Sequence, residues 1–295
     1  MTAEMRLKMT LFPAENQRLF HVFFQPLKTT VLSQNDYDPT MIPGIDVRFD
    51  FTTDTPRYWD RFWENGEGLG KCSQDPDSHS PTLRRYHRIL WSRELPNGEI
   101  MDLKEGYGGD YLVWNGMRFA SDSITTEFRH MRCKELLRSI ESSMDDYRGW
   151  AEDIIRKSYT IGGMMIFPKH RNSINQIRGN SRKIIDRWDL TLECIRRFYS
   201  EEDSPMSWCL EKDRRFFDLF VDFKGFVDFF MLQDCVSNDY SKIKMWIDTE
   251  PFEIDPYPKD KDEYLQWTEN CLGFVEKRNK RILDFTRNEK KFNVQ

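Results

Sequence analysis

The stretch TIGGMMIFPKHRNSINQIRGNSRKIIDRWDLTLECIRRFY, residues 160–199, contains the change in pattern that decides the fold. It begins as an apolar strand that stops at Pro168, continues as a loop with basic but no acidic residues, and ends as a helix predicted to begin at Ser181. On that helix, ionic side chains occupy an arc of about 80° opposite an apolar face. The residues of this ionic arc are Arg182, Asp186, Asp189, Glu193 and Arg197. The helix is expected to dock by its apolar face, and its ionic arc is either a solvated surface or one wall of a polar site.

The sequence that precedes this stretch predicts a mostly antiparallel sheet. Residues 47–51 alternate apolar and polar side chains, as in a half-buried strand. Two β-hairpins are predicted, with turns at the Pro-Asn-Gly of residues 96–98 and the Asn-Gly of residues 115–116, because Asn-Gly is the strongest short hairpin signal. A segment rich in Gly, Ser, Asp and Pro over residues 65–82 is expected to be a long loop.

Further along the chain the spacing of apolar residues becomes helical. An apolar helix is predicted to begin at about Asp213, and a last helix spans residues 262–285. Gly225 in the apolar helix either permits a close approach or is merely tolerated. We predict a single α+β domain over residues 1–295, with helices of the C-terminal half covering the sheet. Its β-rich part covers residues 45–125, its mainly helical part residues 126–285, and a charged tail residues 286–295.

The composition indicates a folded protein with a strongly charged surface. Although 32% of the residues are charged, 22 Phe, 11 Tyr and 9 Trp can build a core that disordered chains lack. The net charge of −5 excludes a uniformly basic surface for nucleic acid but allows a local basic groove. The chain has no secretory signal and no apolar run of about 18 residues, so we expect a cytoplasmic protein that does not associate with membranes.

The cysteines and histidines do not indicate a metal site. Six widely spaced cysteines without a C-x-x-C motif are typical of reduced thiols in a cytosolic protein. The five histidines form neither an H-E-x-x-H motif nor a tight cluster with cysteine. We therefore predict no bound metal.

The basic loop between the strand and the helix suggests an anion-binding site. Arg171 and Arg178 belong to this loop, and the free backbone N–H groups at a helix start attract anions. The loop has no Walker or Rossmann pattern, so it names no particular ligand. We predict ligand-binding roles for Arg171, Arg178 and Arg197 and catalytic roles for Asp186, Asp189 and Glu193.

Several long motifs run through the chain: DPDSHSPTLRRYHRILWSRELPNGE, YTIGGMMIFP, INQIRGN, DRWDLTLECIRRFY and FFDLFVDFKGFVDFF. Together they resemble an uncharacterised family of bacterial and phage-associated proteins of unknown function. The resemblance covers roughly residues 45–285. It implies no activity, but it implies that the ionic arc belongs to the pattern of the family.

A second set of residues resembles the site of ADP-ribosyltransferases. Arg85 and His87 lie in the predicted strand TLRRYHRILW, the later element RFASDS carries Ser121 and Ser123, and Glu193 follows. The resemblance implies that Arg85 or His87 holds a dinucleotide and that Glu193 orients the nicotinamide ribose, with the two serines as braces. The chain departs from that family by reading S-D-S and by placing Glu193 on a helix, so His87 can equally be a satisfied sheet histidine and the serines strand-end caps. The cofactor is unknown, and NAD is implied only under this hypothesis.

Two other functions are compatible with the sequence. Asp186, Asp189 and Glu193 could gather one Mg²⁺ in a nuclease, although the usual strand-borne Asp followed by Glu-x-Lys is absent. The stretch TPRYWDRFWENG, residues 55–66, could instead form the exposed aromatic patch of a non-enzymatic protein-interaction factor in a phage–bacterium setting.

The leading hypothesis is an anion-binding polar cleft that handles a nucleotide or a nucleic acid. Its predicted walls are the basic loop at residues 171–178, the ionic arc, and the strand with Arg85 and His87. Glycosyl or ADP-ribosyl transfer is the most concrete enzymatic version, and whether the protein is an enzyme stays open. The hypothesis requires residues 85–87, 178 and 186–197 to converge on one cavity.

Overall fold

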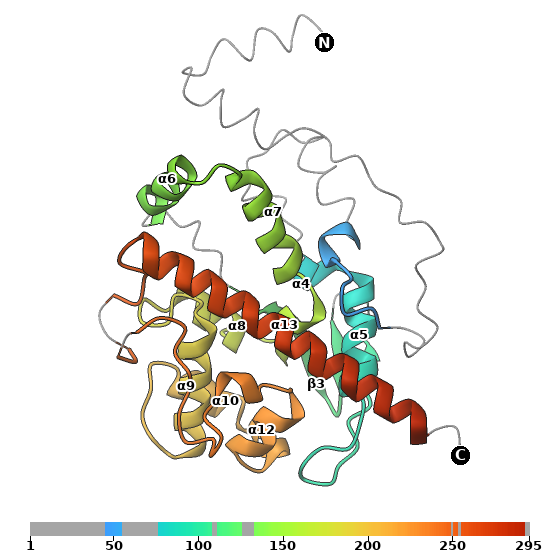
Figure 1. The fold of residues 1–295 in the computed structure, drawn as a ribbon. Coiled ribbons are helices and arrows are strands. Elements are labelled where there is room, and N and C mark those ends of the chain that lie inside the picture. Colours follow the sequence, from blue (N-terminus) through green and yellow to red (C-terminus); the bar gives the residue numbers. More distant parts are fainter. Residues whose placement is uncertain are drawn as a thin grey trace, which may run out of the picture. The chain divides into compact units, whose positions relative to one another are not determined.

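The structure of the chain is a computed structural model that describes residues 45–54, 76–107, 111–125, 133–248, 250–252 and 255–292. All of these residues belong to one compact unit. Figure 1 shows α13 (Lys261–Phe292) as the long red helix across this unit, with α6 (Lys134–Ser143) and α7 (Tyr147–Ser158) above it and α9 (Trp188–Tyr199) below. The predicted aromatic patch at residues 55–66 and most of the predicted loop at residues 65–82 lie outside the described residues.

The sheet has four antiparallel strands in the order β1-β2-β3-β4. The strands are β1 (Lys104–Glu105), β2 (Leu112–Trp114), β3 (Met117–Ser123) and β4 (Met164–Pro168). Asn115 and Gly116 join β2 to β3 as predicted, and their φ angles of 47° and 75° suit an Asn-Gly turn. Strand β4 lies at the edge of the sheet and is nevertheless buried throughout, so helices cover it.

The remaining elements are helices and 3-10 turns. Those before the sheet are η2 (Phe51–Asp54), α4 (Pro76–His79) and α5 (Pro81–Trp91). Those later in the chain are η4 (Ile161–Gly163), α8 (Ile174–Asn180), α10 (Ser207–Lys212), α11 (Arg214–Phe217), η5 (Asp218–Phe220), α12 (Phe223–Phe229) and η6 (Gln233–Cys235). This architecture confirms the predicted α+β class, in which an antiparallel sheet is followed mostly by helices.

The strand predicted at residues 47–51 is wrong. These residues form a turn that leads into η2. The Asp46 and Asp50 carboxylates accept backbone N–H groups two residues further on, from Arg48 and Thr52, at 2.9 Å each. Such local side-chain bonds to the backbone compete with strand pairing.

The predicted strand TLRRYHRILW is wrong as well, because it forms α5 and places Arg85 and His87 on a helix. Ser80 caps this helix by accepting the Leu83 N–H at 3.0 Å, and Pro81 occupies its first turn. The buried residues of α5 follow the helical period; they are Leu83, Tyr86, His87, Leu90 and Trp91. The hairpin predicted next is reduced to a turn at residues 96–98 that a single bridge closes, between residues 94 and 100.

The helix predicted to begin at Ser181 begins later, and residues 174–180 of the predicted basic loop, which include Arg178, form the helix α8. Ser181 ends α8, and α9 begins only at Trp188. Between them Ile185 and Asp186 have positive φ angles of 47° and 65°, so the right-handed helix cannot continue. The ionic arc is therefore broken. Arg182 and Asp186 lie in the turn, whereas Asp189, Glu193 and Arg197 lie on α9.

The apolar helix predicted from Asp213 is also interrupted. Val221 has a φ angle of 68°, and Asp222 begins α12 by accepting the Gly225 N–H at 2.7 Å. A Cβ atom at Gly225 would lie 2.1 Å from the Phe220 carbonyl oxygen, so this position requires glycine. The break allows the aromatic residues of α11, η5 and α12 to pack into one core.

Helix α13 is joined to the sheet by a buried arginine. Arg278 is fully buried and donates hydrogen bonds to the carbonyls of Gly162, Met164 and Phe230 at 2.7–3.0 Å. Burial lowers the pKa of Arg278 to about 9. Backbone carbonyls thus satisfy this guanidinium and hold α13 against the start of β4.

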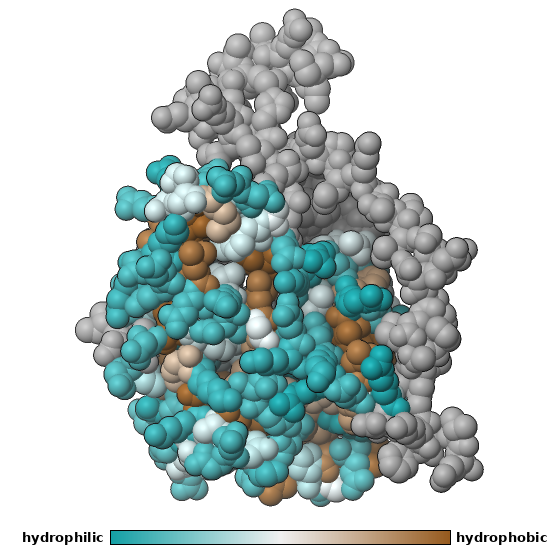
Figure 2. All heavy atoms as spheres, viewed as in Figure 1, coloured by the Kyte–Doolittle hydropathy of each residue, from teal (hydrophilic) through white to brown (hydrophobic). Residues whose placement is uncertain are grey.

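The surface is polar, as the composition predicts. Hydrophilic side chains cover most of the face seen in Figure 2. None of the described helices is both long and apolar enough to cross a membrane. The described cysteines, at positions 133, 194, 209, 235 and 271, are buried free thiols.

Candidate functional site

A cleft of about 650 Å³ lies between β3, α4 and the loop that joins β4 to α8. Its cationic lining residues are Arg118 from β3 and Lys169 and Arg171 from the loop. None of these three side chains has a carboxylate partner among the described residues. Two of the predicted ligand-binding residues, Ser121 and Arg171, line this cleft.

Backbone pairing places two of the cations beside each other. The Lys169 N–H donates to the Arg118 carbonyl at 2.7 Å and so continues the pairing of β3 with β4 by one residue. The charged groups of Arg118 and Lys169 lie 5.1 and 5.5 Å from the ring centroid of Tyr111. A contact with an aromatic face is weakly favourable. It does not neutralise the charges, so two positive charges lie beside the same tyrosine ring.

A second cleft, of about 450 Å³, adjoins the first. The two clefts share Arg118, Lys169 and His170, and the second adds Lys212 of α10 and Arg215 of α11. Arg215 also donates to a carbonyl in the β2–β3 turn at 2.8 Å, which ties α11 to the sheet. Basic side chains from three parts of the chain therefore meet along one surface.

His170 lies at the junction of the two clefts, between a carboxylate and a backbone carbonyl. Its Nε2 donates to Asp213 Oδ1 at 2.7 Å and its Nδ1 to the Arg171 carbonyl at 2.9 Å. A ring that donates from both nitrogens is an imidazolium. Burial acts to lower the pKa of His170, but these two hydrogen bonds outweigh it and raise the pKa from its ordinary value of 6.5. The same contact neutralises Asp213, which is buried.

Arg178 neutralises Asp122, another carboxylate of the larger cleft, without lining the cleft itself. It is fully buried and forms ion pairs with Asp122 at 2.6 Å and Asp186 at 3.2 Å. It also donates to the Ser123 carbonyl at 2.7 Å. Asp122 lines the cleft whereas Arg178 does not. Arg178 thus positions β3 relative to the turn that precedes α9.

Asn175 contributes a hydrogen-bond acceptor to the larger cleft. Its Nδ2 donates to the Ser121 carbonyl at 3.2 Å. This bond fixes the orientation of the amide, because the reverse orientation would bring two oxygen atoms together. Asn175 Oδ1 is buried and has no hydrogen-bond partner among the described residues. An N–H or O–H group of a ligand can satisfy it.

His87 contacts Ser121 but cannot act as its base. The Trp91 indole N–H donates to His87 Nδ1 at 3.0 Å, so the ring proton lies on Nε2 and is donated to Ser121 Oγ at 2.8 Å. Burial, together with the charge of Arg278, lowers the pKa of His87 to about 3 and keeps the ring neutral. Ser121 in turn donates to the Met165 carbonyl at 3.3 Å. These bonds hold α5 against the sheet and do not activate the serine.

The charged residues at the start of α9 and along it are paired with one another. Arg187 and Asp189 are fully buried and joined by two hydrogen bonds of 2.6 and 3.1 Å. Asp189 also accepts a backbone N–H from the segment after η6 at 3.0 Å. Glu193 accepts hydrogen bonds from Arg196 and Arg197 at 2.8 Å each. These carboxylates are neutralised by their own arginines and anchor α9.

The two clefts do not bring all the predicted site residues together. His87 and Arg178 contact β3 from behind the larger cleft, and Ser123 lies on β3 itself, bonded to Thr125 at 2.7 Å. Neither cleft is lined by the other predicted residues, which are Arg85, Asp186, Asp189, Glu193 and Arg197. Residues 85–87, 178 and 186–197 therefore do not share either of these cavities.

Sequence reasoning did not single out Arg118, Asn175, Lys212 and Arg215. Arg118 directly follows the predicted Asn-Gly hairpin, so recognising β3 and β4 as neighbours would have placed it beside the basic loop. No sequence signal brings α10 and α11 to this surface, because their position depends on the packing of the aromatic core.

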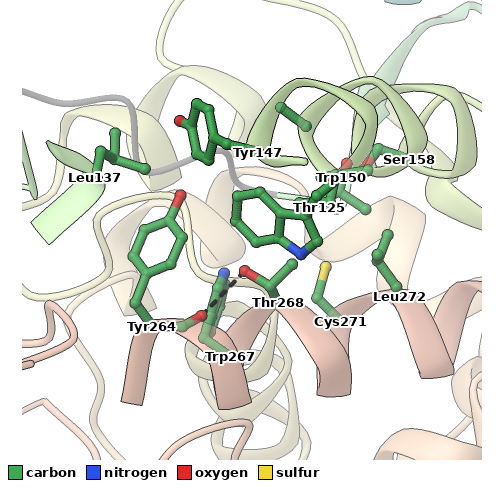
Figure 3. A pocket seen from close by; sticks show the side chains of 12 residues that line it. Thr125, Leu137, Tyr147, Trp150, Ser158, Tyr264, Trp267, Thr268, Cys271 and Leu272 are labelled. Carbon is green, nitrogen blue, oxygen red and sulfur yellow. Dashed lines mark hydrogen bonds between the residues drawn. The ribbon is translucent and has the colours of Figure 1, made fainter. Parts of the chain in front are cut away.

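A third cavity, of about 50 Å³, lies between α7 and α13 and is aromatic (Figure 3). Tyr147 and Trp150 reach it from α7, and Tyr264 and Trp267 from α13. No charged side chain among the described residues lines it. It is a gap in the packing of two helices and offers no group that selects an ionic ligand.

The described residues offer neither a metal centre nor a reactive thiol. No three His, Cys, Asp or Glu side chains among them gather where they could hold a metal ion. Burial raises the pKa of Cys194 and of Cys209 to about 12, so both stay protonated near neutral pH.

The comparisons with known proteins agree with the motifs of the sequence. Residues 45–282, more than half of the chain, match the family of unknown function DUF6994. The chain belongs to this family. The matched residues of this DUF6994 protein include β3, β4, α8 and every residue that lines the two basic clefts. No curated protein and no solved structure gives a significant match.

Proposed function

We propose that this DUF6994 protein binds a phosphate-bearing ligand, a nucleotide or a nucleic acid, in the cleft between β3 and the β4–α8 loop. The observation that carries the proposal is the group of three cations, Arg118, Lys169 and Arg171, which have no carboxylate partner among the described residues. Like charges held close together repel one another. An anion bound between them relieves this repulsion.

The carboxylates of the clefts do not cancel this positive charge. Asp122 is paired with the buried Arg178, and Asp213 with the His170 imidazolium. Asp77 also lines the larger cleft, where it accepts the Ser123 N–H at 2.9 Å. This one further carboxylate faces three cations that have no carboxylate partner among the described residues. The cleft keeps a positive local potential although the whole chain has a net charge of −5.

The side chains of the cleft suit a phosphate joined to a hydrogen-bonding group. Arginine can bind two phosphate oxygens at once, and lysine binds phosphate as a point charge. Asn175 Oδ1 can accept a hydrogen bond from a sugar hydroxyl or a base amine. A volume of about 650 Å³ lies within the roughly 300–1,000 Å³ of small-molecule sites.

Glycosyl or ADP-ribosyl transfer is left out of the proposal for two reasons. Glu193 is paired with two arginines of α9 and does not line the cleft. Ser121 Oγ accepts a hydrogen bond from the His87 Nε2–H, so His87 cannot act as the base that deprotonates it. The buried free thiols favour the reducing cytoplasm as the place of action.

A thermal-shift experiment tests the proposal with ATP, NAD⁺ and a single-stranded oligonucleotide. We expect at least one of these to raise the melting temperature of the wild type. The shift should be lost in the triple variant Arg118→Gln, Lys169→Gln, Arg171→Gln. Lys280→Gln, a substitution of an exposed lysine on α13 that lines neither cleft, removes one charge and should leave the shift unchanged. Absence of any shift in the wild type, or an equal shift in the triple variant, would refute the proposal.

A further inference from the structure

We infer that the ligand is a single-stranded nucleic acid that runs through both clefts. This inference rests on the proposed function and names the substrate class for that site. Its starting point is that the two clefts share Arg118, Lys169 and His170, so these residues form a common boundary. A ligand that binds these shared cations can extend to either side.

The second cleft carries cations of its own. Lys212 and Arg215 line it, and neither has a carboxylate partner among the described residues. Asp213 lies between them in the sequence and is neutralised by His170. Five cationic groups, Arg118, Lys169, Arg171, Lys212 and Arg215, therefore follow one continuous surface that also holds the His170–Asp213 pair. A polyanion can contact all of them, whereas a mononucleotide is accommodated by one cleft and leaves Lys212 and Arg215 unused.

An exposed tryptophan distinguishes a nucleic acid from other polyanions. Trp208 on α10 is 48% exposed, which is unusual for so large an apolar side chain. The Lys212 ammonium lies 4.7 Å from the centroid of its ring. An aromatic side chain next to a cationic groove is the combination that proteins use to stack the bases of single strands.

The concave shape favours a single strand over a duplex. Bases in a duplex are stacked and paired, and only elements that enter a groove reach their edges. Asn175, whose Oδ1 is a buried acceptor without a partner among the described residues, lines the larger cleft. An unpaired base or a sugar hydroxyl can enter such a cleft and donate to it.

A length series of fluorescently labelled DNA and RNA strands tests the inference by anisotropy. The probes are strands of two, four and eight nucleotides, with unlabelled ATP as a competitor. We expect the affinity to rise from the dinucleotide to the eight-nucleotide strand. The double variant Lys212→Gln, Arg215→Gln should weaken binding of the longest strand and lower its salt-dependence slope by about 1.4, because each phosphate that a cation neutralises adds roughly 0.7 to the slope. Trp208→Ala should weaken it about tenfold.

The outcomes separate this inference from the proposed function. If the dinucleotide and ATP bind as tightly as the longest strand and the double variant changes nothing, the single-strand inference is overturned and the nucleotide cleft stands. Heparin is a polyanion without bases. If it displaces the strand at the same concentration of negative charge and Trp208→Ala has no effect, the clefts bind polyanions in general and the single-strand inference is overturned. If no probe binds the wild-type chain, both fail. Lys280→Gln again serves as the control for loss of one positive charge.

Discussion

The charges of α9 and the cations of the clefts differ in how they are compensated. At the start of α9, Arg187 and Asp189 are fully buried and bond to each other. In the larger cleft, Arg118 and Lys169 are exposed, and the described residues supply no carboxylate to them. The sequence makes the first group more conspicuous, because its charges alternate in sign on one short segment. In the structure these conspicuous charges pair with one another and anchor α9. The cations without a carboxylate partner among the described residues lie in the clefts.

Pairing, and not the number of charges, therefore distinguishes a structural ionic cluster from a candidate binding surface. A buried ion pair costs desolvation, and removing one partner leaves the other charge uncompensated. An exposed cation contributes little to folding but attracts anions over a Debye length of about 8–10 Å. The two groups are therefore expected to respond to substitution in opposite ways.

The largest effect is expected at the buried pair of α9. Asp189→Ala leaves Arg187 charged and buried without its carboxylate. We expect the free energy of unfolding to fall by an amount in the upper part of the ~3–5 kcal/mol range for such pairs, as measured by urea denaturation. Glu211→Ala is the matched control, because the Glu211–Arg214 pair is exposed and its loss should leave the free energy of unfolding almost unchanged. Equal losses in the free energy of unfolding in both variants would contradict the distinction between the buried pair and the exposed pair.

Arg178→Met should have the next largest effect. It removes a buried cation from Asp122 and Asp186, whose side chains are 18% and 43% exposed. Water can partly solvate the two carboxylates, so we expect a loss of about 3 kcal/mol, at the lower end of the range for buried pairs. The uncompensated Asp122 should also weaken anion binding in the larger cleft. Unchanged unfolding by urea would show that Arg178 does not hold β3 in place.

Neutralising a cleft cation should leave stability almost unchanged and weaken the ligand. Arg118→Gln and Lys169→Gln are each expected to alter the free energy of unfolding by no more than about 0.5 kcal/mol. Each should lower the affinity for a single-stranded oligonucleotide about fivefold near 0.1 M salt. Urea denaturation and anisotropy on the same preparations measure both quantities. A loss of more than about 2 kcal/mol in the free energy of unfolding would show that Arg118 or Lys169 stabilises the fold, as the paired charges of α9 do.

The smallest effect is expected from pH. The pKa of His170 is raised above its ordinary value of 6.5, so the imidazolium is fully present below that pH and is lost as the pH rises through the raised value. Oligonucleotide affinity should therefore fall a few-fold as the pH increases above about 6.5, because Asp213 then keeps its negative charge without the His170 cation. Phosphodiesters do not titrate in this range. His170→Gln should flatten the profile, and an affinity that rises with pH would contradict the assignment.

The fold was predictable where one local signal dominates. The Asn-Gly turn at residues 115–116 and the buried strand before Pro168 follow from short patterns that no tertiary contact overrides. Residues 47–51 and α5 were mispredicted as strands, because side-chain caps at Asp46, Asp50 and Ser80 decide their backbone conformation.

The candidate site was less predictable because it depends on long-range pairing. Arg171 and Ser121 were predicted and line the larger cleft, and the role of each toward a ligand stays a prediction. Asp189 and Glu193 were chosen for their helical spacing, but spacing does not show that an arginine two to four residues away neutralises each of them. The break between α8 and α9 was missed because Arg178, which binds the Asp186 carbonyl at 2.8 Å, imposes it from inside the core.

The salt dependence of oligonucleotide binding tests the central claim most directly. An eight-nucleotide single strand is titrated by anisotropy against the wild type, the Arg118→Gln, Lys169→Gln, Arg171→Gln triple variant, and the α9 variant Arg196→Gln. We predict that the slope of the logarithm of affinity against the logarithm of salt concentration falls by about 2 in the triple variant, at roughly 0.7 per cation, and is unchanged in Arg196→Gln. An unchanged slope in the triple variant, or an equal fall in Arg196→Gln, would contradict the separation of unpaired cleft cations from the paired charges of α9.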